Sequence, residues 1–495
     1  MRVWLACLVG MLALGSTARA DGDVGDYGPD WTVCRNLEAD PQQEIAACKR
    51  LIDAGVLSQK HLSWAYNNSA TAWLDLKRPD LAFAEFQKSI QTDPSNHAPY
   101  YNLAGLYYDA QHFKEAVDLY DKALALQPGL PDGFCNRGAA LEGLGRSDEA
   151  FASYQRQLAD QSNNDCAIYR LTQLGRQLHR ENAVLEALEG ALAADPGNAE
   201  TYHRRGVIHS DLGQLDLALA DYSEAIRIDP RETGALHDRA MLYRKLNQYP
   251  AALADFDRAV AIAGDQRDNL FWRARLRFEM GDFEKASADC RQRLEMLGQD
   301  AACTGLQWRI AMMKGNFAEA IGYADTMMAG HAEQYRLFRG AAHYADGDLM
   351  KAVAYFVDYT RAAPGDPYGW LWLYLADRKL GKDDAAKMTE LAARRDAWPA
   401  IVIRHIAGKA SAEEVLASID VPDPKLSQLR LAEANYYLGE LAALAGDSAR
   451  AEVLFRSSLA AGAVKIDDET RLPVYKSDDD LERALANAAL HGKGL

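Results

Sequence analysis

The feature that most constrains the fold of this 495-residue chain is a set of alanines and prolines spaced 34 positions apart. A fixed period of about 20 to 50 residues is the signature of stacked structural repeats. A stacked array grows by adding repeats, so this length does not require three ordinary domains. The residues on this spacing are Ala82, Ala116, Ala150, Ala218, Ala252, Ala286 and Ala320, with Pro94, Pro128, Pro196 and Pro230.

Each residue type has a physical cause when repeats are counted from residues 63, 97, 131, 165, 199, 233, 267 and 301. Repeat position 8 is small because the two helices of a repeat approach closely there, and position 20 is the facing alanine. Aromatic residues at positions 4 and 24 fill the space between repeats, and proline at position 32 ends the second helix. This pattern resembles the tetratricopeptide repeat, which implies an all-α, right-handed solenoid of antiparallel helix pairs, with eight repeats over residues 63–332.

Less regular helices are expected on both sides of these repeats. Residues 31–62 predict an atypical N-terminal capping pair, after a Gly/Asp-rich leader at 21–30 whose composition is typical of disorder. Residues 333–464 predict degenerate repeats, including a helix pair with a capping box that runs from Ser411 to Glu414. Residues 465–495 predict a C-terminal capping helix whose polar outer face closes the stack.

The first 20 residues have the pattern of a secretory signal peptide. Arg2 precedes an apolar stretch, and Ala18-Arg19-Ala20 provides a small-residue cleavage site. The stretch is shorter than the roughly 20 residues that span a bilayer, and no later run is longer, so we expect no transmembrane segment. Cys7 lies inside the stretch, which argues against a lipid-modified cysteine and outer-membrane attachment. We therefore expect cleavage after Ala20 and export to the periplasm of a Gram-negative cell.

Six cysteines remain after this cleavage, an even number that permits disulfides in an exported chain. Sequence neighbours suggest three pairs, each on adjoining helices: Cys34 with Cys48, Cys135 with Cys166, and Cys290 with Cys303. The alternative is that these residues are buried free thiols, which are common in protein cores. The absence of a C-x-x-C motif argues against a redox site or a zinc ribbon.

The charge and the motif content exclude several function classes. The net charge of -16 argues against binding to nucleic acid or anionic membranes, because both require a basic surface. The sequence contains no H-E-x-x-H, G-x-S-x-G, Walker A or G-x-G-x-x-G motif, so it predicts no enzyme and no cofactor. His203, His209 and His237 are poorly spaced for joint metal ligation, and we expect them to be surface or groove histidines without a metal.

The candidate binding residues lie on the first helices, which line the concave groove of a tetratricopeptide array. An asparagine side chain has donors and an acceptor that can pair with the backbone of an extended peptide, and arginine suits a carboxylate. Excess negative charge is then expected on the outer surfaces, and the partner is expected to be an acidic or carboxylate-ended peptide. The alternative is that these polar residues only hydrate the groove. The candidates are Asn68, Asn102, Asn136, Arg170 and Arg204 at position 6, with Trp64, Tyr101, Arg244 and Arg275.

Asn136 followed 34 residues later by Arg170 resembles the carboxylate-clamp repeats that grip the C-terminus of a chaperone. The lysines of that clamp have no counterpart, since Tyr101 and Cys166 occupy their places. The match is therefore partial.

The C-terminal third resembles the new-lipoprotein-I family. The similarity lies in several short segments. These are Asp366-Pro367, Trp370–Ala376, Trp398, Ile406–Gly408, Tyr436–Glu440 and Leu454-Phe455. It implies a periplasmic adaptor that forms a homodimer and brings substrates to a tail-specific protease. This chain departs from the family by lacking the lipid-acceptor cysteine and by carrying extra regular repeats in front.

The sequence thus predicts a non-enzymatic adaptor that binds proteins or extended peptides in its groove. One rival is a structural scaffold of an envelope polysaccharide or secretion complex, which would bind folded proteins through its outer face. The other is an enzyme with an unrecognised site, which would need convergent carboxylates in a pocket.

Overall fold

The computed structural model describes residues 27–36, 39–262, 266–328, 335–382, 385–392, 398–422 and 424–461, together with 486, 489 and 490. The signal peptide, most of the leader and most of the predicted C-terminal helix lie outside the described residues. The leader prediction is wrong at its end, because a helix already begins at Pro29.

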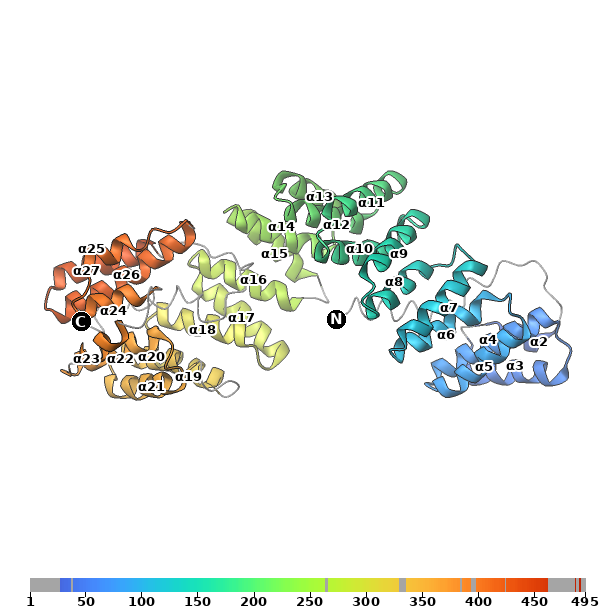
Figure 1. The fold of residues 1–495 in the computed structure, drawn as a ribbon, viewed down its shortest axis with the longest axis horizontal. Coiled ribbons are helices and arrows are strands. Elements are labelled where there is room, and N and C mark those ends of the chain that lie inside the picture. The colour runs from blue at the N-terminus through green and yellow to red at the C-terminus, as the bar shows by residue number, and fades with distance from the viewer. Residues whose placement is uncertain are drawn as a thin grey trace. The chain divides into compact units, whose positions relative to one another are not determined.

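The described residues form consecutive antiparallel helix pairs and contain no strand, which confirms the all-α tetratricopeptide solenoid (Figure 1). They divide into two compact units, unit 1 up to Arg239 and unit 2 from Ala240. The division falls within α14 (Thr233–Lys245). None of the described helices has the length and apolar character that a membrane crossing needs.

Unit 1 contains an N-terminal pair followed by five repeats, each made of two helices. Its helices are α2 (Pro29–Cys34), α3 (Pro41–Ala54), α4 (Gln59–Asp75), α5 (Pro79–Thr92), α6 (His97–Asp109), α7 (Phe113–Leu126), α8 (Gly133–Gly143), α9 (Ser147–Asp160), α10 (Asp165–Gln177), α11 (Glu181–Ala194), α12 (Ala199–Asp211) and α13 (Leu215–Ile228).

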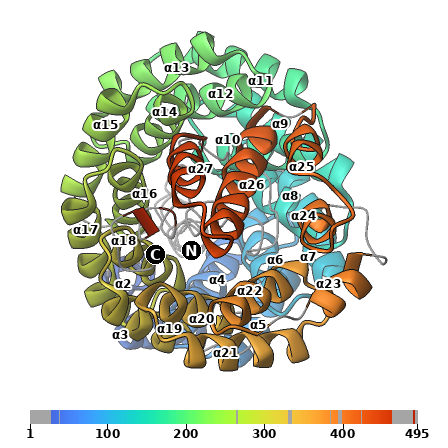
Figure 2. The same cartoon turned by 90° about the vertical axis from the view of Figure 1, so that its left-hand side faces the viewer.

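Unit 2 continues with regular pairs and ends with less regular ones. Figure 2 shows its last pair, α26 and α27, side by side. Its helices are α15 (Tyr249–Ala261), α16 (Gln266–Glu279), α17 (Phe283–Leu297), α18 (Ala301–Met313), α19 (Phe317–Met328), α20 (Arg336–Asp346), α21 (Leu349–Ala362), α22 (Pro367–Lys379), α23 (Ala385–Ala392), α24 (Ala400–Ile406), α25 (Ala412–Ala417), α26 (Pro424–Leu444) and α27 (Ser448–Ala461).

The turn inside each repeat is set by one left-handed residue at repeat position 15. Glycine fills this position in several repeats, with φ of 72° at Gly145 and Gly213, because it has no Cβ to clash in this conformation. Other repeats place Gln111 or His179 there, with φ of 61° and 54°. The same backbone turn therefore recurs whether or not the residue is glycine.

Repeat position 8 is small because the aromatic ring at position 24 of the same repeat lies against it. A Cβ built on Gly206 would lie 2.7 Å from a ring carbon of Tyr222, and one on Gly439 would lie 2.7 Å from a ring carbon of Phe455. This contact refines the sequence analysis, which assigned the position 24 ring to the space between repeats.

Disulfides join Cys34 to Cys48 and Cys135 to Cys166. The first closes the N-terminal pair α2 and α3, and the second links the first helices of consecutive repeats, α8 and α10. The third predicted pairing is wrong, because Cys290 and Cys303 are buried free thiols. A mutual hydrogen bond and burial raise the pKa of the Cys290 thiol, which keeps it protonated.

Glu44 of α3 is a buried carboxyl that weakens unit 1 as the pH rises. It is 2% exposed, and its Oε1 has no hydrogen-bond partner among the described residues. Burial, with a contribution from the Asp75 carboxylate, raises its pKa to about 8. Between pH 4.5 and 8 the unfolded chain has released this proton while the folded chain retains it, so stability falls as pH increases.

Glu44→Gln is therefore expected to stabilise the protein, by a margin that grows from pH 4.5 to pH 8 and reaches roughly 1–3 kcal/mol. Urea unfolding of both proteins across this range measures the margin. A constant difference at all pH values would contradict the assignment.

The core of unit 2 gathers on Trp372 of α22, which is fully buried among aromatic rings of α20, α21 and α26. The predicted capping box is confirmed: Oγ of Ser411 accepts from the Glu414 amide at 3.1 Å, and the Glu414 carboxylate accepts from the Ser411 amide at 2.6 Å. Of the predicted C-terminal helix, Ala486 and Ala489 are buried in this same core.

Candidate functional site on the first helices

Side chains 35 positions apart connect the first helices of successive repeats in unit 1. At four junctions repeat position 5 contacts position 6 of the following repeat, and between α8 and α10 the Cys135–Cys166 disulfide makes the connection. Nδ2 of Asn102 donates to Oδ1 of Asn67 at 3.1 Å, and the Asn136 amide donates to the Tyr101 hydroxyl. We call this series of contacts the 5–6 ladder.

The 5–6 ladder continues into α12 and α14. The Arg204 guanidinium lies 4.9 Å from the centre of the Tyr169 ring, a cation–π distance, and Nε2 of His203 lies 2.7 Å from Oδ2 of Asp238. The contacts differ in chemistry but keep the same positions. These contacts therefore lie on the first-helix face, where the sequence predicts the binding residues, and they hold its side chains in place.

The predicted asparagines lie on this face, but each already ties one helix pair to the one before it. Besides the contacts of Asn102 and Asn136, Nδ2 of Asn68 donates to the Cys34 carbonyl at 3.2 Å. Each amide nitrogen has a second N–H, and none of these has an acceptor among the residues described. The asparagines are therefore held in place rather than free to turn toward a ligand.

The predicted arginines are paired with carboxylates, so they do not form a positively charged strip. Nη1 of Arg170 lies 3.4 Å from the Glu142 carboxylate, and Nε of Arg204 donates to Glu200 at 2.6 Å. In unit 2, Arg244 is 7% exposed and both its Nε and Nη2 bond Glu279, which also lies 3.5 Å from Arg275. The predicted preference for acidic or carboxylate-ended peptides loses its main support, because paired charges attract a carboxylate weakly.

The predicted aromatic anchors are only partly accessible. Tyr101 is 5% exposed and packs 5.5 Å from the Tyr120 ring, and burial raises the pKa of its hydroxyl. Trp64 is half-buried and packs edge-on against His97. Tyr101 is therefore a packing residue and not an anchor. Cys166, the other residue at a clamp lysine position, is held in a disulfide.

A buried histidine surrounded by carboxylates lies where α12 meets the start of α14. His203 is 2% exposed, which corrects the prediction of a surface or groove histidine. Its Nδ1 lies 3.7 Å from both Glu200 and Glu232, and has no hydrogen-bond partner among the described residues. Burial alone lowers its pKa, but Asp238 and Glu200 raise it to about 9. His203 is therefore cationic at neutral pH when nothing else occupies this space.

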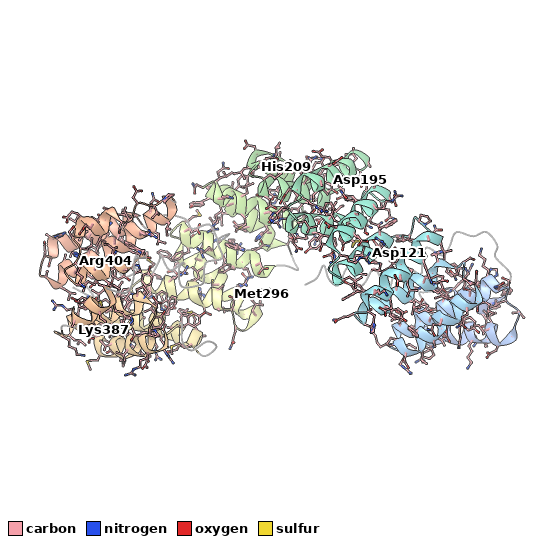
Figure 3. The ribbon with its side chains drawn as sticks, viewed as in Figure 1. Asp121, Asp195, His209, Met296, Lys387 and Arg404 are labelled. Atoms are coloured by element: carbon pink, nitrogen blue, oxygen red, sulfur yellow. A yellow bond between two sulfur atoms is a disulfide. The ribbon has the colours of Figure 1, made fainter. Side chains whose placement is uncertain are left out.

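The neighbouring carboxylates respond to this histidine in opposite ways. Burial alone raises the pKa of Glu200, but His203 and Arg204 lower it to about 2. Burial, together with the Glu200 charge, raises the pKa of Glu232. One nitrogen and two carboxylate oxygens from Glu200, His203 and Glu232 all lie within 4.8 Å of one another, a grouping that could hold a metal ion. His209, further along α12 (Figure 3), bonds Gln214 and takes no part in this grouping.

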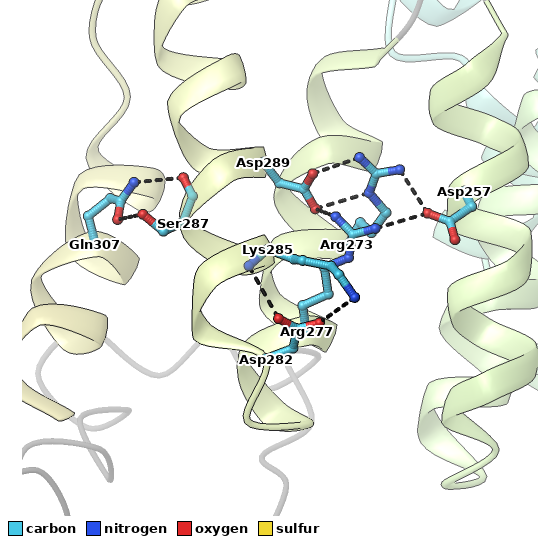
Figure 4. A network of polar contacts seen from close by, with 8 residues as sticks. All are labelled: Asp257, Arg273, Arg277, Asp282, Lys285, Ser287, Asp289 and Gln307. Carbon is cyan, nitrogen blue, oxygen red and sulfur yellow. Dashed lines mark hydrogen bonds and ion pairs between the residues drawn. The ribbon is translucent and has the colours of Figure 1, made fainter. Parts of the chain in front are cut away.

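An arginine at repeat position 7 was missed by the sequence analysis. In Figure 4, Arg273 and Arg277 lie between Asp289 at position 23 of the same repeat and Asp257 at position 25 of the preceding one. In unit 1, Arg205 pairs with Asp221 at 2.6 Å in the same register. Arg137 bonds Ser153 and Asp121 at these two positions (Asp121 is labelled in Figure 3). Arginine at position 7 recurs together with aspartate at position 23 in the sequence, and this recurrence could have predicted the ion pairs.

A groove of about 410 Å³ runs between the second helices α9 and α11. It is lined mainly by small and apolar side chains, among them Leu158, Ala183, Ala187 and Gly190. A Cβ on Gly190 would have no neighbour within 4 Å, so this part of the groove is open. The groove lies on the second-helix side of unit 1, away from the 5–6 ladder.

Models of the tetratricopeptide repeat match residues 74–132, 199–232, 233–264 and 309–367. The chain is 30% identical over 112 residues to the Hsp70-Hsp90 organising protein of Plasmodium falciparum, covering 22% of this chain and 44% of that protein. It is 29% identical over 136 residues to the heat shock protein STI1 of Saccharomyces cerevisiae, covering 27% of this chain and 23% of that protein. It therefore spans less than half the length of these relatives.

Among solved structures, a tetratricopeptide repeat protein from Parabacteroides merdae is 17% identical, with a TM-score of 0.38. The match covers 50% of this chain and 98% of that one.

Proposed function

We propose that this tetratricopeptide-repeat protein is an exported periplasmic adaptor that binds extended peptide segments or partner proteins on the first-helix face of unit 1. The observation that carries the proposal is the 5–6 ladder, which holds polar groups in place before a partner arrives. A preformed surface loses little conformational entropy on binding, so more of the contact energy becomes affinity.

Two further facts support a protein partner. One relative to which this chain is similar is named as an organising protein of Hsp70 and Hsp90, and organising other proteins is an adaptor role. Asn68 and Asn102 are half-buried, and each has an amide N–H without an acceptor among the described residues that can donate to a carbonyl of an extended peptide, whereas Asn136 is 7% exposed and serves the packing. The resemblance of the C-terminal third to the new-lipoprotein-I family extends the proposal: the adaptor forms a homodimer and presents substrates to an envelope protease.

Ala139 offers a test that leaves the ladder intact. It lies on α8 three residues after Asn136, so both share one helix face, and it is half-buried. Ala139→Arg is expected to weaken partner binding at least about 10-fold, because it places a bulky charge where the peptide would lie. Pulldown from periplasmic extract identifies the partner, and titration of that purified partner measures the change.

The α9–α11 groove favours a second candidate, a scaffold that binds folded proteins through its outer face. Ala187→Arg fills this groove and is the matched substitution. Loss of binding in Ala139→Arg alone supports the adaptor, and loss in Ala187→Arg alone supports the scaffold. Export is tested separately by finding the protein in the periplasmic fraction, cleaved after Ala20.

A further inference from the structure

Glu200, His203 and Glu232 direct one imidazole nitrogen and two carboxylates toward a common point inside unit 1. Glu200 and His203 lie three residues apart on α12, which places them on one helix face, and Glu232 directly precedes α14. Nδ1 of His203 lies 3.7 Å from an oxygen of each carboxylate, too far for a hydrogen bond to either. A buried nitrogen placed between two carboxylates without bonding them is unusual, since buried polar groups are normally paired.

We propose that these three side chains bind a divalent transition-metal ion, with Zn²⁺ as the ion that suits them best. Zn²⁺ takes imidazole nitrogen and carboxylate oxygen ligands at about 2.0–2.2 Å. Two ligands of a tetrahedral ion with such bonds lie roughly 3.4 Å apart. The observed 3.7 Å separations between Nδ1 and each carboxylate lie close to this value, and all three ligand atoms lie within 4.8 Å of one another, so binding requires the ligands to move inward. Mg²⁺ and Ca²⁺ prefer oxygen ligands alone, so an imidazole in the set disfavours them.

Asp238 prepares the histidine for this role. Its Oδ2 lies 2.7 Å from Nε2 of His203, so Nε2 carries the proton that is donated to the carboxylate. The Nδ1 lone pair is then available for the metal, and the second proton leaves to solvent. A carboxylate that orients a ligating histidine in this way is the usual second layer of a zinc site. Asp238 acts as a positioning residue.

The charges and the packing at this point also suit a dication. With His203 neutral, the net charge around it is about −2. It comes from the carboxylates of Glu200, Glu232 and Asp238 and the guanidinium of Arg204. Gly234 allows the first turn of α14 to approach the imidazole, because a Cβ there would lie 2.5 Å from Cε1 of His203. At this junction of two repeats, unit 1 therefore has an anionic site whose side chains are half-buried or buried.

Isothermal titration of ZnCl₂ into tag-free, chelator-treated full-length protein is the decisive experiment. The expected result is one Zn²⁺ per chain, with a rise in Tm that MgCl₂ does not produce. His203→Gln and Glu232→Gln are each expected to weaken Zn²⁺ binding by at least about 100-fold. Asp238→Asn is expected to weaken it by about 10–100-fold, as loss of an orienting carboxylate does elsewhere.

His209→Gln is the matched control. It removes a second buried histidine from the same helix, one whose Nδ1 lies 2.6 Å from Gln214, and it should leave Zn²⁺ affinity unchanged. Circular dichroism checks the fold of each variant. If His203→Gln does not fold, Glu232→Gln decides, because its side chain is 23% exposed and tolerates an amide.

The proposal is overturned if the parent protein binds no Zn²⁺, or if His203→Gln and Glu232→Gln bind it as tightly as the parent. Equal losses in His209→Gln and His203→Gln would also overturn it, because the metal would then occupy some other set of ligands. In each of those outcomes His203 is a cationic core residue neutralised by three acids.

Discussion

Replacing Asp289 with alanine is expected to destabilise unit 2 by about 3–5 kcal/mol, because the change leaves two guanidinium groups without their buried partner. Asp289 is 3% exposed. It receives hydrogen bonds from Arg273 at 2.6 and 3.0 Å and from Arg277 at 2.6 Å (Figure 4). Neither arginine is well exposed, so water cannot fully replace the lost carboxylate.

Asp257→Ala is the control within the same network. Asp257 contacts the same two arginines at 2.8 and 3.2 Å, but its side chain is 48% exposed. Removing a solvated partner should cost less than about 1 kcal/mol. Urea unfolding measures both changes, and hydrogen–deuterium exchange should place the Asp289→Ala effect in α16 and α17. Equal effects of the two substitutions would show that burial does not control the strength of this network.

Trp372→Ala is expected to cost about 3–5 kcal/mol, as deletion of a fully buried tryptophan does in other cores. Its ring lies 5.5 Å from Tyr344, 5.6 Å from Tyr436 and 6.0 Å from Phe356, measured between ring centres. The cavity left by the indole therefore borders three helices besides α22. Trp372→Phe should cost less, because Nε1 of this tryptophan has no hydrogen-bond partner among the described residues.

Trp370→Ala provides the comparison two residues earlier on the same helix. Trp370 is half-buried, its Nε1 donates to the Pro364 carbonyl at 3.2 Å, and Lys387 lies 5.1 Å from its ring centre. Because these contacts lie at the surface, we expect a loss of roughly 1 kcal/mol. Thermal unfolding of the two variants distinguishes them, and a larger loss in Trp370→Ala would contradict the assigned core.

The sequence predicted the helix pairs because small and aromatic residues recur wherever two helices meet, a spacing that packing enforces. It did not predict which side chains would bond across repeats. Asn136 and Arg204 were assigned to peptide capture from their position alone. In the structure Asn136 bonds Tyr101, and Arg204 contacts Glu200 and Tyr169. Partner choice depends on side-chain rotamers and burial, which spacing does not determine.

The partners of His203 were likewise not predicted from the sequence. The spacing of His203, His209 and His237 argued against a metal site, but the groups around His203 are carboxylates, and two of them, Glu232 and Asp238, lie about one repeat away in the sequence. Comparing position 5 of each repeat with position 6 of the next would have paired His203 with Asp238. A disulfide between Cys290 and Cys303 was predicted from their proximity. The two thiols are indeed neighbours in the structure, but they are not bonded to each other through sulfur.

The 5–6 ladder also determines how such a chain can change in evolution. Each contact joins two neighbouring repeats, so duplicating or deleting one complete repeat keeps a position 5 residue facing a position 6 residue at every junction. The pair at the new junction is nevertheless a new combination: loss of residues 199–232, for example, would leave Tyr169 facing Asp238 in place of Arg204. Substitutions at these two positions should therefore be correlated between adjacent repeats, and the fit of each junction limits which repeats can be neighbours.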